Sequence, residues 1–101
     1  MKLTEQKEVI LNDFNFEKVE KVMKALDWKW VDGNAHGNFE YQPKIDDLKR
    51  VASLCLDNVI NNTDDEHSCS IGGFEALKTN GMLELRFVPE VSNPFTYLNK
   101  H

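Results

Sequence analysis

The chain has 101 residues, of which 41% are hydrophobic and 29% are charged, and its formal net charge at pH 7 is −5. This length suits a single domain, residues 1–101, with one modest core. The acidic balance argues against a nonspecific nucleic-acid binder, which would need a basic surface. It is compatible with a protein that binds basic protein surfaces, and equally with simple solubility.

The sequence shows neither a membrane span nor an export signal. The longest uncharged apolar run is far shorter than a span, and Val9-Ile10-Leu11 is too short for the apolar region of a secretory signal. Cys55 and Cys69 are the two cysteines, and they do not have the spacing of a disulfide framework. We therefore expect a cytoplasmic protein with free thiols and no membrane association.

The N-terminal part of the chain predicts one clear helix. Residues 1–13 mix charges with one apolar cluster, and we expect a frayed start or a short helix there. Asn15 then suits a helix N-cap, because its side-chain oxygen can accept an otherwise unpaired backbone N–H. Apolar residues recur at helical spacing over residues 16–26, with Glu–Lys pairs four residues apart on the opposite face. These apolar positions are Phe16, Val19, Val22, Met23 and Leu26.

A short hairpin is predicted next. Trp28 and Trp30 alternate with a lysine, residues 33–38 are rich in turn-forming Gly and Asn, and residues 39–41 alternate again. The two tryptophan rings would share one face of the first strand. Core packing is the default role for that face, and stacking on a ligand is the alternative.

A second helix is predicted over residues 43–60. Pro43 suits its first turn, because the missing N–H costs nothing at that position. An apolar stripe at helical spacing follows, formed by Leu48, Val51, Ala52, Cys55, Leu56 and Val59. Residues 63–67 are then expected to form an acidic loop.

The strongest local signal is Asn80-Gly81, which lies between two apolar-rich runs within residues 70–88. A type I′ turn needs positive φ at both central residues, and Asn and Gly tolerate it best. A two-residue loop places Thr79 opposite Met82 and fixes the register. The further pairs are Leu77 with Glu84, Ala76 with Leu85, Glu75 with Arg86 and Phe74 with Phe87. Alternation gives a wet face with the Glu75–Arg86 pair and an apolar face formed by Phe74, Ala76, Leu83, Leu85 and Phe87.

These elements predict an α+β fold, in which two helices pack on an antiparallel sheet built from a short hairpin and a long C-terminal hairpin. Pro89 ends the ladder of the second hairpin. Residues 91–101 are expected to pack against the body of the protein or against a partner.

Metal and catalytic chemistry find no support in the residue spacing. His36, His67 and Cys69 lack the close ligand pairs of structural zinc sites, and Cys55 is expected in the core. No constellation of nucleophile, acid and base occurs. We therefore predict a protein with no enzymatic activity, no metal and no cofactor.

A ligand site is predicted around Gly72-Gly73. Adjacent glycines weaken a strand, so they are typical either of a β-bulge or of a backbone that a phosphate approaches. Arg86 would lie across the hairpin and Arg50 on the second helix, and arginine suits bidentate phosphate contact. The alternative roles of these arginines are a surface salt bridge and a solvated helix face. Phe74 or Trp30 would stack on a base, although the predicted register points Phe74 to the core.

Several runs of residues carry a resemblance to a known class of proteins. They are Phe14-x-Phe16-x-x-Val19-x-x-Val22-Met23-x-x-Leu26-x-Trp28-x-Trp30, Pro43 at the start of a helix, Ile71-Gly72-Gly73-Phe74-x-Ala76, and Leu83-x-Leu85-x-Phe87-Val88. Over most of residues 14–88 this pattern resembles small accessory proteins encoded in bacteriophages and prophages. Such proteins include signal sponges of the Thoeris anti-defence type, which sequester an immune signalling nucleotide. They also include anti-CRISPR proteins, which block a protein by surface contact. The resemblance implies a functional class and assigns no binding residues.

The residues and the resemblance together give the function hypotheses. The first is a non-enzymatic phage accessory protein that sequesters a nucleotide-derived immune signal, with Gly72, Gly73, Arg86 and Arg50 on the phosphate. The alternative is an anti-CRISPR-like protein–protein inhibitor of a host defence complex, which uses the acidic surface and the C-terminal tail. The third is a structural or regulatory phage protein. Each would act in the host-cell cytoplasm without binding nucleic acid directly, and a homo-oligomer is compatible with each.

Overall fold

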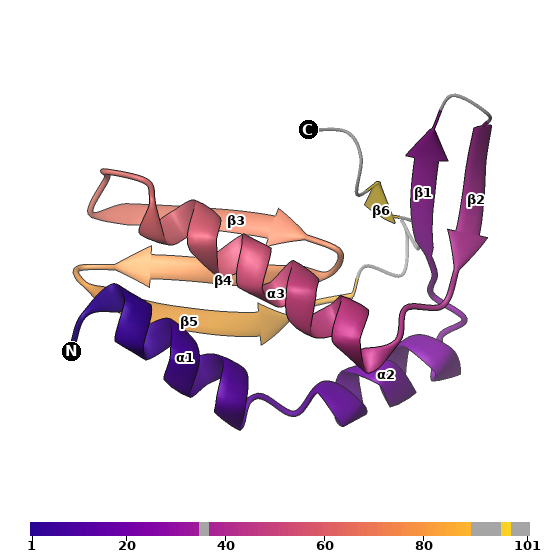
Figure 1. The fold of residues 1–101 in the computed structure, drawn as a ribbon, viewed down its shortest axis with the longest axis horizontal. Coiled ribbons are helices and arrows are strands. Elements are labelled where there is room, and N and C mark those ends of the chain that lie inside the picture. The colour runs from indigo at the N-terminus through magenta and orange to yellow at the C-terminus, as the bar shows by residue number, and fades with distance from the viewer. Residues whose placement is uncertain (35–36, 90–95, 98–101) are drawn as a thin grey trace.

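Three helices and two small sheets form the described part of the computed structural model, which comprises residues 1–34, 37–89 and 96–97 (Figure 1). The helices are α1 (Leu3–Asp13), α2 (Phe16–Ala25) and α3 (Ile45–Ile60). The strands are β1 (Trp30–Asn34), β2 (Gly37–Tyr41), β3 (Glu66–Ile71), β4 (Phe74–Thr79), β5 (Met82–Phe87) and β6 (Thr96–Tyr97). The predicted α+β class is confirmed. Of the two alternatives for residues 1–13, the helix is present as α1, and the two hairpins lie in separate sheets.

The sheets have the strand orders β2-β1-β6 and β3-β4-β5. β1 pairs antiparallel with β2 and parallel with β6, whereas β3, β4 and β5 form an antiparallel meander. Figure 1 shows α3 lying across one face of the meander, α1 beside β5, and the β1–β2 hairpin beyond one end of the meander. Of the predicted C-terminal tail, residues 96–97 form β6, and the remainder of residues 91–101 lies outside the described residues.

The α2 helix begins as the sequence predicts. Oδ1 of Asn15 accepts a hydrogen bond from the backbone N–H of Lys18 at 3.0 Å, which satisfies one of the unpaired donors of the first turn. The predicted apolar stripe ends early, because the helix stops at Ala25 and Leu26 is exposed. Asp27, at a φ of 51°, then turns the chain toward the first tryptophan.

The α3 helix begins two residues after Pro43, at Ile45. The backbone N–H of Lys44 donates to Oδ2 of Asp47 at 3.0 Å, so an acidic side chain closes the first turn where the helix dipole favours it. All of the predicted stripe is buried, namely Leu48, Val51, Ala52, Cys55, Leu56 and Val59. This stripe forms the centre of the core between α3 and the meander.

The N-terminal residues form a full helix. Ile10 and Leu11 of α1 pack against the core, whereas Val9 is exposed, so two of the three apolar residues expected to dock do so. Nζ of Lys7 lies 2.7 Å from Oδ1 of Asp57 on α3, which fixes α1 beside that helix.

The register predicted for the last hairpin is confirmed. Thr79 lies opposite Met82, and the pairing continues without a break to Phe74 opposite Phe87. Asn80 and Gly81 have φ values of 49° and 83°, the positive values that a type I′ turn requires at both central residues. Turn chemistry and binary pattern therefore specify the same register.

The chain around Gly72-Gly73 does not form one continuous strand with a bulge. β3 ends at Ile71 and β4 begins at Phe74, so the two glycines are the loop of a second two-residue turn, with φ values of 64° and 92°. The bulge prediction is wrong for this reason, and the long hairpin is a three-stranded meander. Its first strand begins at Glu66, within the predicted acidic loop.

One charged residue lies on the face predicted to be apolar. Lys78 is opposite Leu83, points toward α3 and is buried. Its Nζ donates to the backbone carbonyl of Asn62, just beyond the end of α3. Carbonyl groups near a helix C-terminus carry partial negative charge, which favours a cation at this position. The contact also links β4 to the segment that follows α3.

The turn geometry predicts the effect of a substitution at Gly81. Gly81→Val places a β-branched side chain at positive φ, and we expect it to lower the free energy of unfolding by more than about 1 kcal/mol. No atom lies within 4 Å of a Cβ built at this position, so the loss would come from backbone strain alone. Chemical denaturation measures it. Gly81→Asn is the control and should lose much less, because Asn tolerates this conformation; an unchanged stability of Gly81→Val would refute the turn.

Candidate functional site

The predicted ligand site at Gly72-Gly73 is closed by the two tryptophans. Nε1–H of Trp30 donates to the carbonyl of Gly72 at 3.0 Å, and a Cβ on Gly72 would lie 2.8 Å from Cζ2 of that ring. A Cβ on Gly73 would lie 2.5 Å from Cζ3 of Trp28. The Gly73 carbonyl accepts from the backbone N–H of Val88 at 2.7 Å. Ring packing and positive φ therefore account for both glycines without a ligand.

The residues predicted to stack on a base are in the core. Trp30 and Phe74 are both 0% exposed. Phe74 is surrounded by aromatic rings, with centroid distances of 6.0 Å to Phe14, 6.0 Å to Phe16 and 5.3 Å to Phe87. Stacking on a base needs an accessible ring face, so neither side chain can perform it in this conformation. The register had pointed Phe74 to the core, and that expectation is confirmed.

Arg86 lies on the outer face of the meander in a network with two glutamates. Its Nε donates to Oε2 of Glu84 at 2.6 Å and its Nη2 donates to Oε1 at 3.0 Å, while Nη1 lies 3.8 Å from Oε1 of Glu75. The predicted cross-strand pair with Glu75 is therefore present, but the nearer partner is on the same strand. The hydrogen bond from Arg86 lowers the pKa of Glu84, and the same contact raises the pKa of Arg86.

The predicted phosphate ligands do not converge. Arg50 is an exposed residue of α3 whose Nη2 lies 3.9 Å from Oδ1 of Asp47. The buried face of α3 packs on the inner face of the meander, and Arg86 is on the outer face. The helix and the sheet therefore separate the two arginines. Of the six predicted site residues, the structure brings together Trp30, Gly72, Gly73 and Phe74, in the core, and leaves both arginines outside it.

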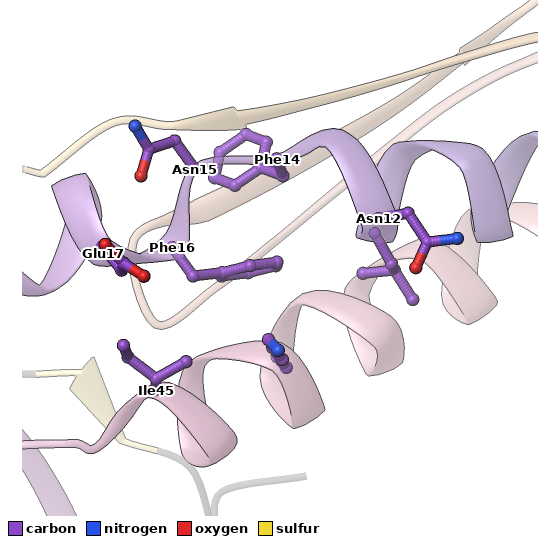
Figure 2. Close-up of a pocket in the computed structure, with 8 residues that line it drawn as sticks. Asn12, Phe14, Asn15, Phe16, Glu17 and Ile45 are labelled. Carbon is purple, nitrogen blue, oxygen red and sulfur yellow. The ribbon is translucent and has the colours of Figure 1, made fainter.

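A cavity that the sequence did not indicate lies where α1 meets α2 (Figure 2). It has a volume of about 310 Å³ and is lined by Leu11, Asn12, Phe14, Asn15, Phe16, Glu17, Ile45 and Lys49. Asn15 already serves as the N-cap of α2. The Lys49 ammonium is offset by the Glu17 carboxylate in the same lining, so the cavity offers a polyphosphate little net attraction. Only the packing of three helices creates it, and periodicity within one helix gives no sign of it.

The outer face of the meander, which points away from α3, is the main charged surface of the sheet. Its charged side chains are Glu66 on β3, Glu75 on β4, and Glu84 and Arg86 on β5. Exposed Met82 is the first residue of β5 and exposed Val88 directly follows its last residue, with both side chains on the same side by alternation. We call this surface the acidic sheet face.

The thiols and potential metal ligands form no reactive centre in the described ranges. Among those residues, no group of three or more His, Cys, Asp or Glu side chains could hold a metal ion. Sγ of Cys55 donates to the backbone carbonyl of Cys69 at 2.9 Å, and burial raises the pKa of this thiol to about 12, with the Cys69 thiol adding to the effect. A thiol kept protonated is a poor nucleophile. His36 lies outside the described residues.

We compared the chain with protein-family models, with curated proteins and with solved structures, and none of the three comparisons found a match. Within the described part of the chain, no helix has both the length and the apolar character needed to cross a membrane.

Packing of Trp28 on the glycine turn predicts unequal effects of the same substitution at two turns. Gly73→Ala and Gly81→Ala both place a Cβ at positive φ, but only the first meets a ring, at 2.5 Å. We expect about 1 kcal/mol of destabilisation for Gly81→Ala and at least about 2 kcal/mol more for Gly73→Ala. Equal losses in chemical denaturation would show that the rings do not lie on the turn.

Burial of Cys55 predicts its reactivity. Because the thiolate is the reacting species, a thiol reagent should modify Cys69 first and Cys55 only after denaturation, even near pH 10. By linkage, the raised pKa of Cys55 stabilises the fold fully below the unfolded value of 9.0, and that stabilisation is lost as the pH rises toward about 12. Mass spectrometry of labelled peptides measures the order. Rapid labelling of native Cys55 would place it outside the core.

Proposed function

We propose that this protein is a non-enzymatic inhibitor that binds a partner protein through the acidic sheet face. The observation that carries the proposal is the composition of this face, where glutamates outnumber arginine three to one and exposed apolar side chains lie beside them. Such a face suits a basic partner surface, because opposite charge speeds encounter and selects the partner while apolar contact adds affinity. The resemblance to anti-CRISPR-like phage proteins points to a host defence complex as the partner class.

Polarity alone would not make this face a binding surface, because one side of an antiparallel sheet commonly faces water. The exposed apolar residues are the additional feature. Met82, the first residue of β5, is 66% exposed, and Val88, which directly follows the strand, is 50% exposed. Between them lie Glu84 and Arg86, so β5 presents charged residues flanked by apolar residues. Interfaces commonly combine apolar contact with polar groups in this way.

Sequestration of a nucleotide-derived signal is the second candidate, and the cavity between α1 and α2 is the observation that favours it. Its volume of about 310 Å³ is at the lower end of the range for small-molecule sites. Lys49 is its cation. This candidate needs a different site from the one predicted around the glycine pair, because Trp30 and Phe74 are buried.

Charge reversal on the acidic sheet face should remove partner binding without unfolding the protein. We expect the double variant Glu75→Lys and Glu84→Lys to lose, in a pull-down from bacterial lysate, a protein that the wild type retains at low salt. The side chains are solvent-exposed or half-exposed, so little change in Tm is expected. The control is the double variant Glu8→Lys and Asp13→Lys, at exposed positions of α1. It changes the net charge by the same amount as the first double variant and should retain the partner. Equal capture by both double variants would contradict the proposal.

A nucleotide screen distinguishes the second candidate, because a ligand that binds only the folded state raises Tm. If the acidic sheet face carries the function, no cyclic or linear nucleotide should raise the Tm of the wild type. A rise that Arg86→Ala abolishes, at an unchanged unliganded Tm, would instead support the site predicted from the sequence. A rise that Lys49→Ala abolishes would place the ligand in the cavity.

A further inference from the structure

The two edges of the meander differ in how their backbone groups are satisfied. At the β5 edge, Gln6 of α1 acts as a covering side chain. Its Nε2 donates to the carbonyl of Gly81 at 2.8 Å and its Oε1 accepts from the N–H of Leu83 at 2.9 Å. At the β3 edge, no described strand pairs with the outer side of the strand. An edge that is left unpaired is a template for another strand.

The turn at Gly72-Gly73 decides which groups of β3 point outward. In a two-residue hairpin the closing pair, here Ile71 and Phe74, exchanges both backbone hydrogen bonds, and bonding pairs then alternate along the ladder. The N–H of Asn80 donates to the carbonyl of Asp65 at 3.1 Å, which agrees with this alternation. The backbone groups of the intervening residues, Glu66, Ser68 and Ser70, therefore point away from β4.

The β3 edge has few of the features that prevent edge pairing. Natural edge strands commonly carry lysine, proline or a bulge, or are covered by another element. β3 reads Glu-His-Ser-Cys-Ser-Ile over Glu66–Ile71, with small residues in its middle and one acidic residue at its start. Its pairing with β4 continues over the whole strand without a bulge.

An antiparallel copy of β3 fits this edge in one register best. When a two-fold axis passes through Ser68, Ser68 faces its own copy and Glu66 faces Ser70 of the second copy, so no like charges oppose each other. All three outward-pointing residues of each strand are paired, which gives about six backbone hydrogen bonds. A shift of the axis by two residues in either direction leaves part of the strand unpaired, so this register is preferred.

The α3 helix brings a second element close to the axis. It contacts both β3 and β4, and Nδ2 of its Asn58 donates to Sγ of Cys69 at 3.4 Å, so Asn58 lies on the flank toward β3. Because Cys69 is next to Ser68, this part of α3 lies near the axis. Pairing of β3 with its copy would therefore bring the Asn58 flanks of the two helices toward each other over one face of the joined sheet.

From these features we infer that the chain forms a two-fold dimer, in which β3 pairs antiparallel with β3 of a second copy and the flank of α3 that carries Asn58 faces its copy. The two meanders become one continuous sheet. This inference goes beyond the proposed function, since it concerns a different edge of the sheet and does not depend on the acidic sheet face.

Solution mass measured over a range of concentrations tests the dimer. We expect the wild type to reach twice the chain mass of 11.7 kDa on concentration. Ser68→Pro should stay monomeric and folded, because the N–H that proline lacks is used only in the dimer and proline is tolerated at such edge positions. The control Met82→Glu, at an exposed position away from the β3 edge, should still dimerise.

A cysteine variant tests the register. Ser68→Cys places two thiols opposite each other on the axis, with Cα atoms about 5.5 Å apart, and should form a covalent dimer on oxidation. Ser70→Cys is the matched control and should not, because its nearest partner in the second copy is Glu66. A wild type that stays at 11.7 kDa at all concentrations would overturn the dimer. So would a dimer that survives Ser68→Pro. Partner capture is read separately, so either result leaves the test of the acidic sheet face intact.

Discussion

Packing of Trp28 and Trp30 on the Gly72-Gly73 turn is the contact on which the rest of the structure depends. In the described part of the chain the β1–β2 hairpin and the meander share no strand pairing, so these rings join the two sheets. The missing Cβ atoms allow the rings to touch the turn, and the indole N–H of Trp30 pairs with a buried carbonyl that would otherwise be costly. The glycines thus serve both the positive φ of the turn and the close approach of the rings.

The same contact limits what the protein can bind. Two tryptophans and Phe74 are the side chains best suited to stacking on a base, and the core uses all three. Two of the cations on the meander are similarly occupied, since Arg86 lies between two glutamates and Lys78 pairs with a carbonyl just beyond the end of α3. A nucleotide site would need both kinds of group in one accessible place. The proposed function therefore uses the outer surface, where carboxylates predominate over arginine on the meander.

The sequence predicted those features that depend on neighbouring residues. The Asn80-Gly81 turn fixed the register of β4 and β5, because turn type sets pairing without help from the rest of the chain. The cap at Asn15 and the stripe of α3 follow from helical periodicity in the same way. The conformation at Gly72-Gly73 was harder to predict. Apolar and polar residues alternate on both sides of the pair, and this pattern is the same for a β-bulge as for a two-residue turn. Lys78 was missed because its partner, the Asn62 carbonyl, lies beyond a helix end that only the fold brings near.

The convergence of the predicted site residues depends on a different level of structure. Arg50 and Arg86 were correctly placed on a helix and a strand, but whether they meet depends on which faces of those elements pack together. Residue spacing gives the faces of each element separately, and the relative placement of elements comes from the core. The cavity between α1 and α2 escaped notice for the same reason, because its lining comes from three helices.

The edges of the meander connect the dimer to the proposed function. A two-fold axis that pairs one β3 with another is perpendicular to the sheet, so the acidic sheet faces of both copies lie on the same side. Their glutamates would form one larger acidic surface, and the negative potential over it would exceed that of a single copy. A basic partner with two matching sites would then bind both halves at once, and the second contact would benefit from the high local concentration that the first creates. Gln6 contributes to this arrangement by occupying backbone groups at the start of the β5 edge, beside which α1 lies, and this opposes a second pairing at that edge.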